Sequence, residues 1–248
     1  MTSGSNSVLT HGAASTLRVV AFDAYGTLFN VYAVAQAAED CFPGHGGRIA
    51  QVWRDKQLEY SRLRALAGPD HYVSFWQITQ DALDFVDRLL GLSMTEAQRD
   101  TLLGAYARLT PYPEVQQVLS ALCESGRRLC ILSNGDPQML QRAISAAQLG
   151  YAFQAVLSVH ELKTFKVAPQ TYGLVLEAFQ VQPHQVCLVS SNAWDVCGAR
   201  WAGLQAFWVN RQQMPMEVLG VAPSGEGRDL KDLLAWLSAG GSEAFPLS

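Results

Sequence analysis

Short apolar runs, each closed by polar residues, recur along the chain. They carry Val, Ile, Leu or Phe at successive positions, which is typical of parallel strands buried on both faces. Five such runs are present: "RVVAFD" (18–23), "RLCILSN" (128–134), "AVLSV" (155–159), "VCLVSS" (186–191) and "AFWVN" (206–210). We therefore predict a parallel sheet that contains these five strands.

Helical patterns separate most of these runs. The segment "EVQQVLSALCESG" spaces its apolar residues along one face and ends at Gly126, a candidate C-cap. The segment "DPQMLQRAISAAQLG" offers Asp136 as N-cap, Pro137 at the first helical position and Gly150 as the end. Strands that alternate with helices predict an α/β fold, a Rossmann-like parallel sheet with helices on both faces.

One long interval departs from this alternation. Residues 30–112 contain no strand-like run. Residues 74–91 instead space apolar side chains in helical steps, and "SMTE" (93–96) predicts a capping box before the next helix. We therefore predict a core domain formed by residues 17–29 and 113–240, with residues 30–112 as an inserted helical cap domain. Such an insert would cover the carboxyl ends of the strands, where open α/β sheets bind ligands.

Length and composition agree with this organisation. A chain of 248 residues, 49% hydrophobic, suits a core domain with a smaller insert. The net charge of −4 is small and is not gathered in a tail. Because the sequence has neither a basic stripe nor a basic amphipathic stretch, nucleic acid and membrane surfaces are not expected partners.

The amino-terminal residues and the cysteines bear on location. Residues 1–16 are small and polar and lack the charged start and long apolar core of a signal peptide, so they predict a disordered tail. The five cysteines are odd in number and show no CxxC spacing. These features predict a reduced, cytoplasmic protein without a thiolate metal site.

Polar residues close the strand runs, and these residues are the candidate chemistry. Strand ends of one parallel sheet lie side by side, so groups that follow different strands can converge. The candidates are Asp23 after the first run, Ser133 and Asn134 after the second, Lys166 beyond the third, and Ser190, Asn192, Trp194 and Asp195 after the fourth.

Asp23 and Lys166 together indicate a nucleophilic carboxylate. Burial alone disfavours the charged form of a carboxylate, whereas a neighbouring lysine keeps a carboxylate ionised. Ionised carboxylates serve as covalent nucleophiles in enzymes. Gly26 permits a tight turn after the strand, and the hydroxyl of Thr27 is placed to orient the acid.

Four segments then resemble a known family. In order, "FDAYGTLFNV", "LSNG", Lys166 to Tyr172, and "SSNAWD" resemble the four motifs of the haloacid dehalogenase superfamily, and within it the L-2-haloacid dehalogenases. The resemblance runs from about residue 18 to residue 210 and has the helical insert in the expected place.

The same motifs separate two branches of that superfamily. Its phosphatases carry a second Asp where this chain has Tyr25, and they hold Mg²⁺ with acids of the fourth motif, where this chain has Asn192 and a lone Asp195. A halide leaves as a stable anion and needs no proton, so Tyr25 does not hinder its release. The substitutions favour carbon–halogen displacement with no metal and no other cofactor.

The resemblance implies a role for each motif residue. Asp23 would attack the carbon that carries the halogen, while Thr27, Ser190 and Lys166 would position and polarise it. Ser133 would bind the substrate carboxylate.

A second set would surround the halide and the water. Arg54 and Asn134 would receive the halide, and Tyr172 would help to orient the site. Asn192 and Asp195 would support Lys166 and the hydrolytic water.

Tyr25 and an apolar wall would complete the substrate pocket. The wall would be formed by Leu58, Phe75 and Trp194. Two positions depart from the family pattern: Asn30 stands where Asp is common, and Val167 follows Lys166 where proline is usual and would have fixed the loop.

Ordinary structural roles stay open for several of these residues. Arg54 could lie on a solvated helix face, Tyr172 could be plain helix packing, Asn192 could cap a helix, and Asp195 could be a surface acid. Hydroxyls and apolar residues at these positions could equally be turn or core residues: Thr27, Ser190, Leu58, Phe75 and Trp194.

The sequence thus predicts a hydrolase that removes halide from a short L-2-haloacid with water. It would form a D-2-hydroxy acid through an aspartyl ester, with a homodimer as the expected assembly. A Mg²⁺-dependent phosphatase is the alternative enzyme, and a chelator distinguishes the two. A non-catalytic binder of small carboxylates is the alternative outside catalysis, and Asp23 and Lys166 together argue against it, since a binder of anions gains nothing from a buried negative group.

Overall fold

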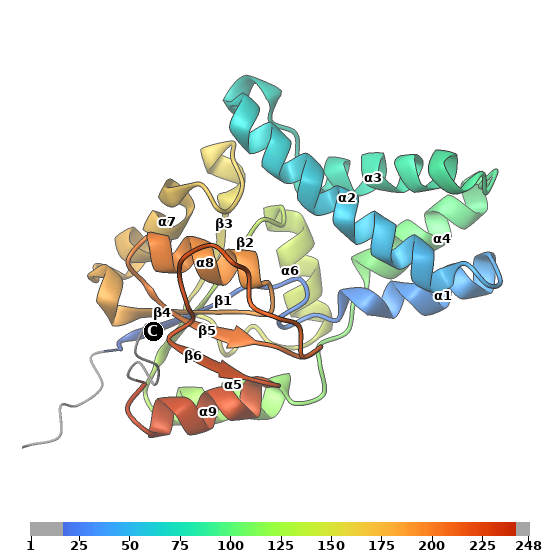
Figure 1. The fold of residues 1–248 in the computed structure, drawn as a ribbon. Coiled ribbons are helices and arrows are strands. Elements are labelled where there is room, and N and C mark those ends of the chain that lie inside the picture. Colours follow the sequence, from blue (N-terminus) through green and yellow to red (C-terminus); the bar gives the residue numbers. More distant parts are fainter. Residues whose placement is uncertain (1–16, 242–248) are drawn as a thin grey trace, which may run out of the picture.

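A six-stranded parallel sheet forms the centre of the molecule. The computed structural model describes residues 17–241, so the predicted disordered tail at 1–16 lies outside the described residues. The strands follow the order β3-β2-β1-β4-β5-β6, and each paired neighbour is parallel (Figure 1). Their bounds are β1 Val19–Phe22, β2 Arg128–Ser133, β3 Ala155–Ser158, β4 Val186–Ser190, β5 Gln205–Val209 and β6 Gly225–Gly227.

The five predicted strands are confirmed, with one correction and one addition. Burial on both faces is wrong for β3, where Val156 is 42% exposed, because β3 is an edge strand paired only with β2. The sequence prediction missed β6, whose "GEG" has no apolar run. Its Gly225 lies against the ring of Trp236, where a Cβ atom would come within 2.7 Å of the indole.

Helices cover both faces of this sheet, so the predicted α/β class is confirmed. Val20 and Phe22 of β1 pack in one core with α5, α6 and α9, while Val19 and Ala21 point into the other core with α7 and α8. The helix bounds are α5 Val115–Glu124, α6 Pro137–Ala146, α7 Pro169–Phe179, α8 Ala193–Trp201 and α9 Leu230–Ser238.

Helix ends follow the predicted caps in part. Gly126 takes a left-handed φ of 75° just after α5, and Pro137 opens α6 with Asp136 at its N-cap. The prediction that α6 extends to Gly150 is wrong, because α6 ends at Ala146. Gln148 takes a left-handed φ of 56°, and Leu149 N–H donates to the carbonyl of Ile144 at 3.0 Å, which closes the helix earlier.

Helices fill the chain between β1 and β2, as the sequence predicts. Their bounds are α1 Val34–Cys41, α2 Gly46–Ala67, α3 Phe75–Leu90 and α4 Glu96–Ala107, with 3-10 turns at Val31–Ala33 and Pro69–His71. The capping box lies two residues later than predicted, between Thr95 and Gln98. Ser93 cannot serve as its N-cap because it takes a left-handed φ of 51° rather than an extended one.

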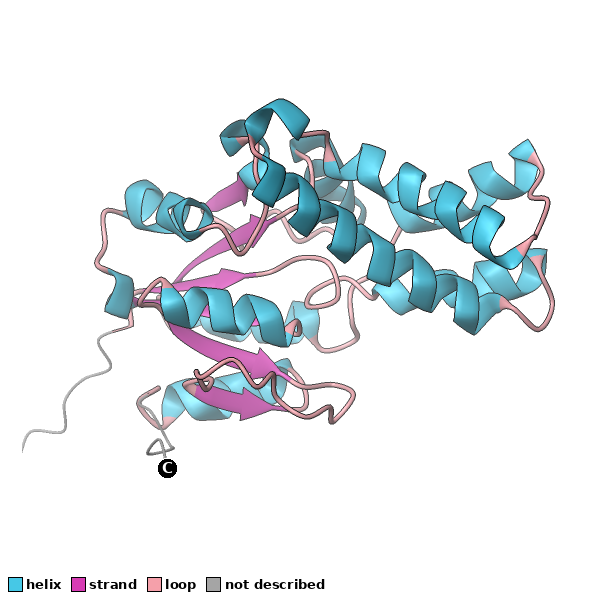
Figure 2. Cartoon of the chain, turned by 45° about the horizontal axis from the view of Figure 1, so that its top comes forward, coloured by secondary structure: helices cyan, strands magenta, loops and turns pink. Residues whose placement is uncertain are grey.

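The strand order places the nucleophile candidate at the middle of the sheet. β1 lies between β2 and β4, so Asp23 follows Phe22 beside the ends of both neighbours. After β1 the chain forms β2 and β3 on one side of β1 and then β4 and β5 on the other side. The carboxyl end of β1 is therefore a topological switch point. The strands point toward helices α1 to α4 (Figure 2). Within residues 17–241, no helix has the length and apolar character to cross a membrane.

Candidate active site

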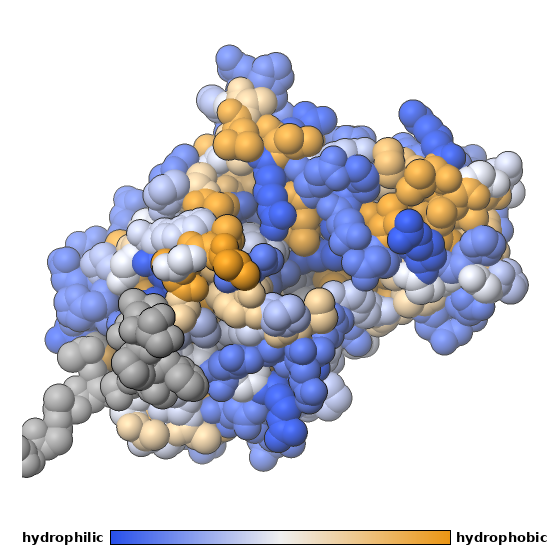
Figure 3. Space-filling view, viewed as in Figure 1, coloured by the Kyte–Doolittle hydropathy of each residue, from blue (hydrophilic) through white to orange (hydrophobic). Residues whose placement is uncertain are grey.

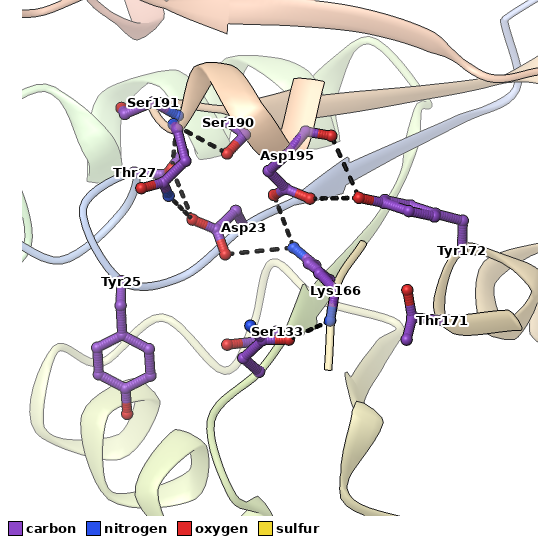
Figure 4. Close-up of polar contacts among 12 residues, drawn as sticks. Asp23, Tyr25, Thr27, Ser133, Lys166, Thr171, Tyr172, Ser190, Ser191 and Asp195 are labelled. Atoms are coloured by element: carbon purple, nitrogen blue, oxygen red, sulfur yellow. Dashed lines mark hydrogen bonds and ion pairs between the residues drawn. The ribbon is translucent and has the colours of Figure 1, made fainter. Parts of the chain in front are cut away.

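Asp23 is the centre of a buried polar cluster at the end of β1 (Figure 4). Its side chain is nearly buried, at 6% exposure. Oδ2 accepts from Thr27 Oγ1 at 3.0 Å and from Asn192 Nδ2 at 2.9 Å, and Oδ1 accepts from Lys166 Nζ at 3.3 Å. Three donors therefore fix the carboxylate, and one of them is a cation.

Lys166 lies between two carboxylates. Its Nζ is 3.3 Å from Asp23 Oδ1 and 2.8 Å from Asp195 Oδ2, and its side chain is fully buried. Burial by itself lowers the pKa of Lys166, but Asp195 and Asp23 outweigh burial and raise that pKa above its ordinary value. The lysine is therefore a cation that stabilises both acids. Its backbone N–H donates to Asn134 Oδ1 at 2.9 Å, and the peptide bond to Val167 is cis.

Asp195 and Tyr172 form the far end of the same cluster. Asp195 is completely buried on α8, which excludes the alternative of a surface acid. Burial raises the pKa of Asp195, and Lys166 acts against that rise. Tyr172 on α7 donates to Asp195 Oδ1 at 2.9 Å, and burial raises its pKa well above the ordinary value. Tyr172 is thus a permanent donor that holds Asp195 in place, and its role extends beyond packing.

The three predicted hydroxyls each accept a backbone N–H at a strand end. Thr27 Oγ1 accepts from Ser191 N at 2.8 Å while it donates to Asp23, so it ties the β1 loop to the β4 loop. Ser190 Oγ accepts from Asn192 N at 3.1 Å. Ser133 Oγ accepts from the N–H of Gly135 at 3.1 Å.

Asn192 contacts the nucleophile candidate instead of its own helix. It occupies the N-cap position of α8, but its side chain makes no capping hydrogen bond. Its amide nitrogen donates to Asp23, and its Oδ1 accepts from Arg54 Nη2 at 3.3 Å. The resemblance implies support of Lys166 by Asn192, whereas the observed contacts go to Asp23 and Arg54.

Arg54 brings the inserted helices into the site. It lies on α2, is partly buried, and its Nη2 also donates to the carbonyl of Tyr25 at 3.4 Å. Figure 4 shows the Tyr25 ring directed away from Lys166. Burial raises the pKa of Tyr25 well above its ordinary value, with smaller contributions from Tyr106, Asp136 and Asp23. Tyr25 therefore presents a neutral ring where phosphatases of the superfamily have a second acid.

A small pocket opens beside Asp23, and every residue that lines it is a residue that the sequence predicts for the site. Phe75 is buried, while Leu58 and Trp194 are partly buried. The lining residues are Asp23, Tyr25, Arg54, Leu58, Phe75, Ser133, Asn134, Asn192 and Trp194. The other predicted residues belong to the polar cluster around Asp23 and do not line this pocket: Thr27, Lys166, Tyr172, Ser190 and Asp195.

Two residues near this site escaped the sequence prediction. Arg211 Nη2 donates to the carbonyl of Thr27 at 3.1 Å and lies 2.7 Å from Glu114 Oε1, so it braces the loop that carries Thr27. Its signal was available, because it directly follows the "AFWVN" strand run. Tyr106 stacks on Tyr25 with ring centroids 5.9 Å apart, and no local pattern marks that contact.

A divalent cation does not fit these side chains. Lys166 Nζ lies between the Asp23 and Asp195 carboxylates and already neutralises part of their negative charge. Asn192 turns its amide nitrogen, a donor, toward Asp23. Across residues 17–241, no group of three or more His, Cys, Asp or Glu is arranged to hold a metal ion.

Known proteins are similar to this chain in sequence and in fold. A model of the haloacid dehalogenase-like hydrolases matches residues 17–203. The chain belongs to this hydrolase family. An (S)-2-haloacid dehalogenase of Pseudomonas sp. (strain YL) is 41% identical over 215 residues, which cover 87% of this chain and 92% of that protein.

Two solved structures are also similar to this haloacid dehalogenase-like hydrolase. One is an L-2-haloacid dehalogenase with 47% identity and a TM-score of 0.88, covering 90% of this chain and 99% of its own. The other is the L-2-haloacid dehalogenase of Xanthobacter autotrophicus with chloropropionic acid covalently bound. It has 39% identity and a TM-score of 0.83, and it covers 90% of this chain and 98% of its own.

Proposed function

We propose that this hydrolase removes halide from short (S)-2-haloacids, also named L-2-haloacids, and releases D-2-hydroxy acids without a metal. The observation that carries the proposal is the Asp23 carboxylate, which is held by Lys166, Thr27 and Asn192 and borders the small pocket. The relatives, which are dehalogenases of these acids, support the substrate class.

The first step is a displacement at the carbon that carries the halogen. Asp23 Oδ2 already accepts two hydrogen bonds and Oδ1 accepts one, from Lys166, so Oδ1 is the less committed oxygen and attacks. The new C–O bond forms as the C–halogen bond breaks, and the halide leaves with the electron pair. Ser133 binds the substrate carboxylate, while Arg54 and Asn134, which line the same pocket, receive the halide.

The second step is hydrolysis of the Asp23 ester. Water attacks the carbonyl carbon of Asp23, the acyl–oxygen bond breaks, and one proton is released. The carbon inverted in the first step is left untouched, so the product is the D-2-hydroxy acid. Support comes from the Xanthobacter autotrophicus structure with covalently bound chloropropionic acid, a covalent adduct on a protein with 39% identity to this one.

The two alternatives fit the site less well. A Mg²⁺-dependent phosphatase of this superfamily needs a second acid where Tyr25 lies, and acids in the fourth motif, where Asn192 instead donates its amide to Asp23. A non-catalytic binder of carboxylates gains nothing from the nearly buried Asp23 at the edge of its pocket. Displacement of halide at carbon needs neither a metal nor a second acid, and it uses the Asp23 carboxylate at the edge of the pocket.

Halide release from L-2-chloropropionate tests this proposal. We expect equal rates with and without excess EDTA, because the described residues contain no group of three or more His, Cys, Asp or Glu arranged to hold a metal ion. Chiral chromatography should find only the D-2-hydroxy acid. Loss of activity that Mg²⁺ restores, or a product of retained configuration, would reject the proposed chemistry.

Arg54→Lys tests the halide pocket. Lysine keeps the charge but loses the planar guanidinium, whose Nη2 donates to Asn192 Oδ1 and to the Tyr25 carbonyl. We expect kcat/KM for L-2-chloropropionate to fall at least about tenfold, roughly 1.4 kcal/mol of transition-state stabilisation. Arg48→Lys, on the exposed face of the same helix, is the matched control and should leave kcat/KM unchanged. Equal kinetics of the two variants would return Arg54 to an ordinary helix face.

Domain division, assembly and location complete the proposal. Residues 30–112 form the cap domain over a core of residues 17–29 and 113–240. A homodimer forms through exposed apolar residues of the cap, since Leu63, Leu66 and Leu89 on α2 and α3 are each more than half exposed. Figure 3 shows hydrophobic surface in two separate areas of the helical region, with hydrophilic surface between them. The protein acts in the cytoplasm, in keeping with five free cysteines.

A further inference from the structure

Asp136 uses its carboxylate on a helix that is not its own. It occupies the N-cap position of α6, yet its side chain makes no capping bond there. Its Oδ1 accepts from Phe75 N and its Oδ2 from Trp76 N, both at 2.9 Å. Phe75 and Trp76 are the first two residues of α3, so a side chain at the start of α6 holds the first turn of α3.

The Asp136 carboxylate satisfies N–H groups at the start of α3. A helix begins with N–H groups that have no partner inside the helix and that attract negative charge. Ser74 satisfies one of them, since its Oγ accepts from Gln77 N at 3.1 Å. Asp136 satisfies two more, and it is only 8% exposed, so water competes poorly for these bonds. Charged hydrogen bonds of this kind are about twice as strong as neutral ones.

The position of Phe75 follows from the position of this helix end. Phe75 lines the pocket beside Asp23, and its ring packs against Tyr25 at 6.2 Å and Phe165 at 6.3 Å between centroids. Phe165 directly precedes Lys166. The first residue of α3 is thus a wall of the reaction pocket and also a residue whose N–H is fixed by Asp136.

A second contact joins Tyr72, just before α3, to the surroundings of Asp136. The hydroxyl of Tyr72 lies 3.0 Å from His160 Nδ1, and that nitrogen is 3.5 Å from Asp136 Oδ1. The Tyr72 ring stacks on Phe165 with centroids 5.1 Å apart. The segment before α3 and the start of α3 therefore meet one continuous surface formed by Asp136, His160 and Phe165.

We propose that Asp136 is a positioning residue that latches α3 over the pocket and holds Phe75 in its wall. The inference rests on the proposed function for its kinetic test. An alternative partner for the carboxylate is at hand, because Asp136 has the extended backbone of an N-cap, with φ of −65° and ψ of 153°. When α3 moves away, the side chain can turn to the free N–H groups of α6.

Asp136→Ala should raise KM for L-2-chloropropionate at least about tenfold and leave kcat within about twofold. Only the latched state binds substrate, so a smaller latched fraction weakens the apparent affinity, while a saturating substrate restores that state. Asp136→Asn keeps one oxygen acceptor and should give an intermediate KM. A merely structural role would instead lower kcat with the active fraction and leave KM unchanged.

Ser74→Ala is the matched control. It removes a cap from the same end of α3 but leaves the link to Asp136, so it should not change KM. Amide hydrogen exchange followed by NMR gives a readout that needs no substrate. Exchange at Phe75 and Trp76 should be at least about tenfold faster in Asp136→Ala, whereas Ser74→Ala should act mainly on Gln77.

The outcomes separate this inference from the proposed function. A wild-type protein without halide release would reject the proposed function, and the exchange rates at Phe75 and Trp76 would still decide the latch. The proposed latch would be overturned if Asp136→Ala left the exchange at those two amides unchanged, or if its KM equalled that of Ser74→Ala.

Discussion

Asp23→Ala is expected to abolish halide release, with a loss of roughly 10⁴-fold or more in kcat. The expected loss is this large because Asp23 is the proposed nucleophile and no other carboxylate lines the pocket within the described residues. Asp195 cannot replace it, since Asp195 is completely buried and bonded to Lys166 and Tyr172. Initial rates of chloride release from L-2-chloropropionate measure the effect. Asp100→Ala, at an exposed acid of α4, is the control and should keep full activity.

Oxygen labelling distinguishes the nucleophile from a general base. In ¹⁸O-water, with enzyme in excess so that each site turns over once, the new hydroxyl should be unlabelled, because it carries one of Asp23's own oxygens. Mass spectrometry of a digest should find the label in the peptide that contains Asp23. Labelled hydroxy acid on the first turnover would mean that Asp23 activates water instead of attacking carbon.

Much of the candidate site could be predicted from the sequence because many of its residues directly follow strands. Five strand runs were readable from consecutive apolar residues, and the ends of parallel strands share one edge. Asp23, Ser133 and Asn192 come from three different segments and still meet around one pocket, because β1 lies between β2 and β4. Arg54 and Phe75 were placed by the family resemblance, since nothing in their local pattern separates a pocket wall from an ordinary helix face.

What the sequence could not predict depends on contacts between distant segments. Asp136 before Pro137 predicts a local helix cap, but its carboxylate is bonded to Phe75 and Trp76, which belong to a helix far back in the chain. Arg211 follows a strand, yet only the fold shows that it reaches the Thr27 carbonyl. A local pattern indicates where an element lies but not which partner its polar side chains bind.

Lys166→Met is expected to lower kcat by roughly 10³-fold or more and to make folding stability depend strongly on pH. Methionine fills a similar volume but leaves Asp23 and Asp195 without the cation that lies between them. Removing one partner of a buried ion pair costs about 3–5 kcal/mol, because the remaining charge is uncompensated. Lys231→Met, at an exposed position at the start of α9, removes the same charge and should change neither property.

The sign of the pH dependence follows from the two carboxylates. Burial already raises the pKa of Asp195, and Lys166 opposes that rise in the wild-type protein. Without the lysine, the folded-state pKa of Asp195 lies above its ordinary unfolded value, so the folded variant holds a proton that the unfolded chain releases. Its stability is therefore greatest at low pH and is lost as the pH rises through the folded-state pKa of Asp195.

Urea unfolding at pH 5 and pH 8 tests this prediction. The difference in free energy of unfolding between wild type and Lys166→Met should be larger at pH 8, where the folded variant must either keep protons or bury two bare charges. The double variant Lys166→Met, Asp195→Asn removes one of those charges, so it should regain much of the stability at pH 8. It should not regain activity, because Asp23 still lacks the cation that holds its Oδ1. An equal loss of stability at both pH values would mean that Lys166 acts through packing alone and not as the counter-charge of the nucleophile.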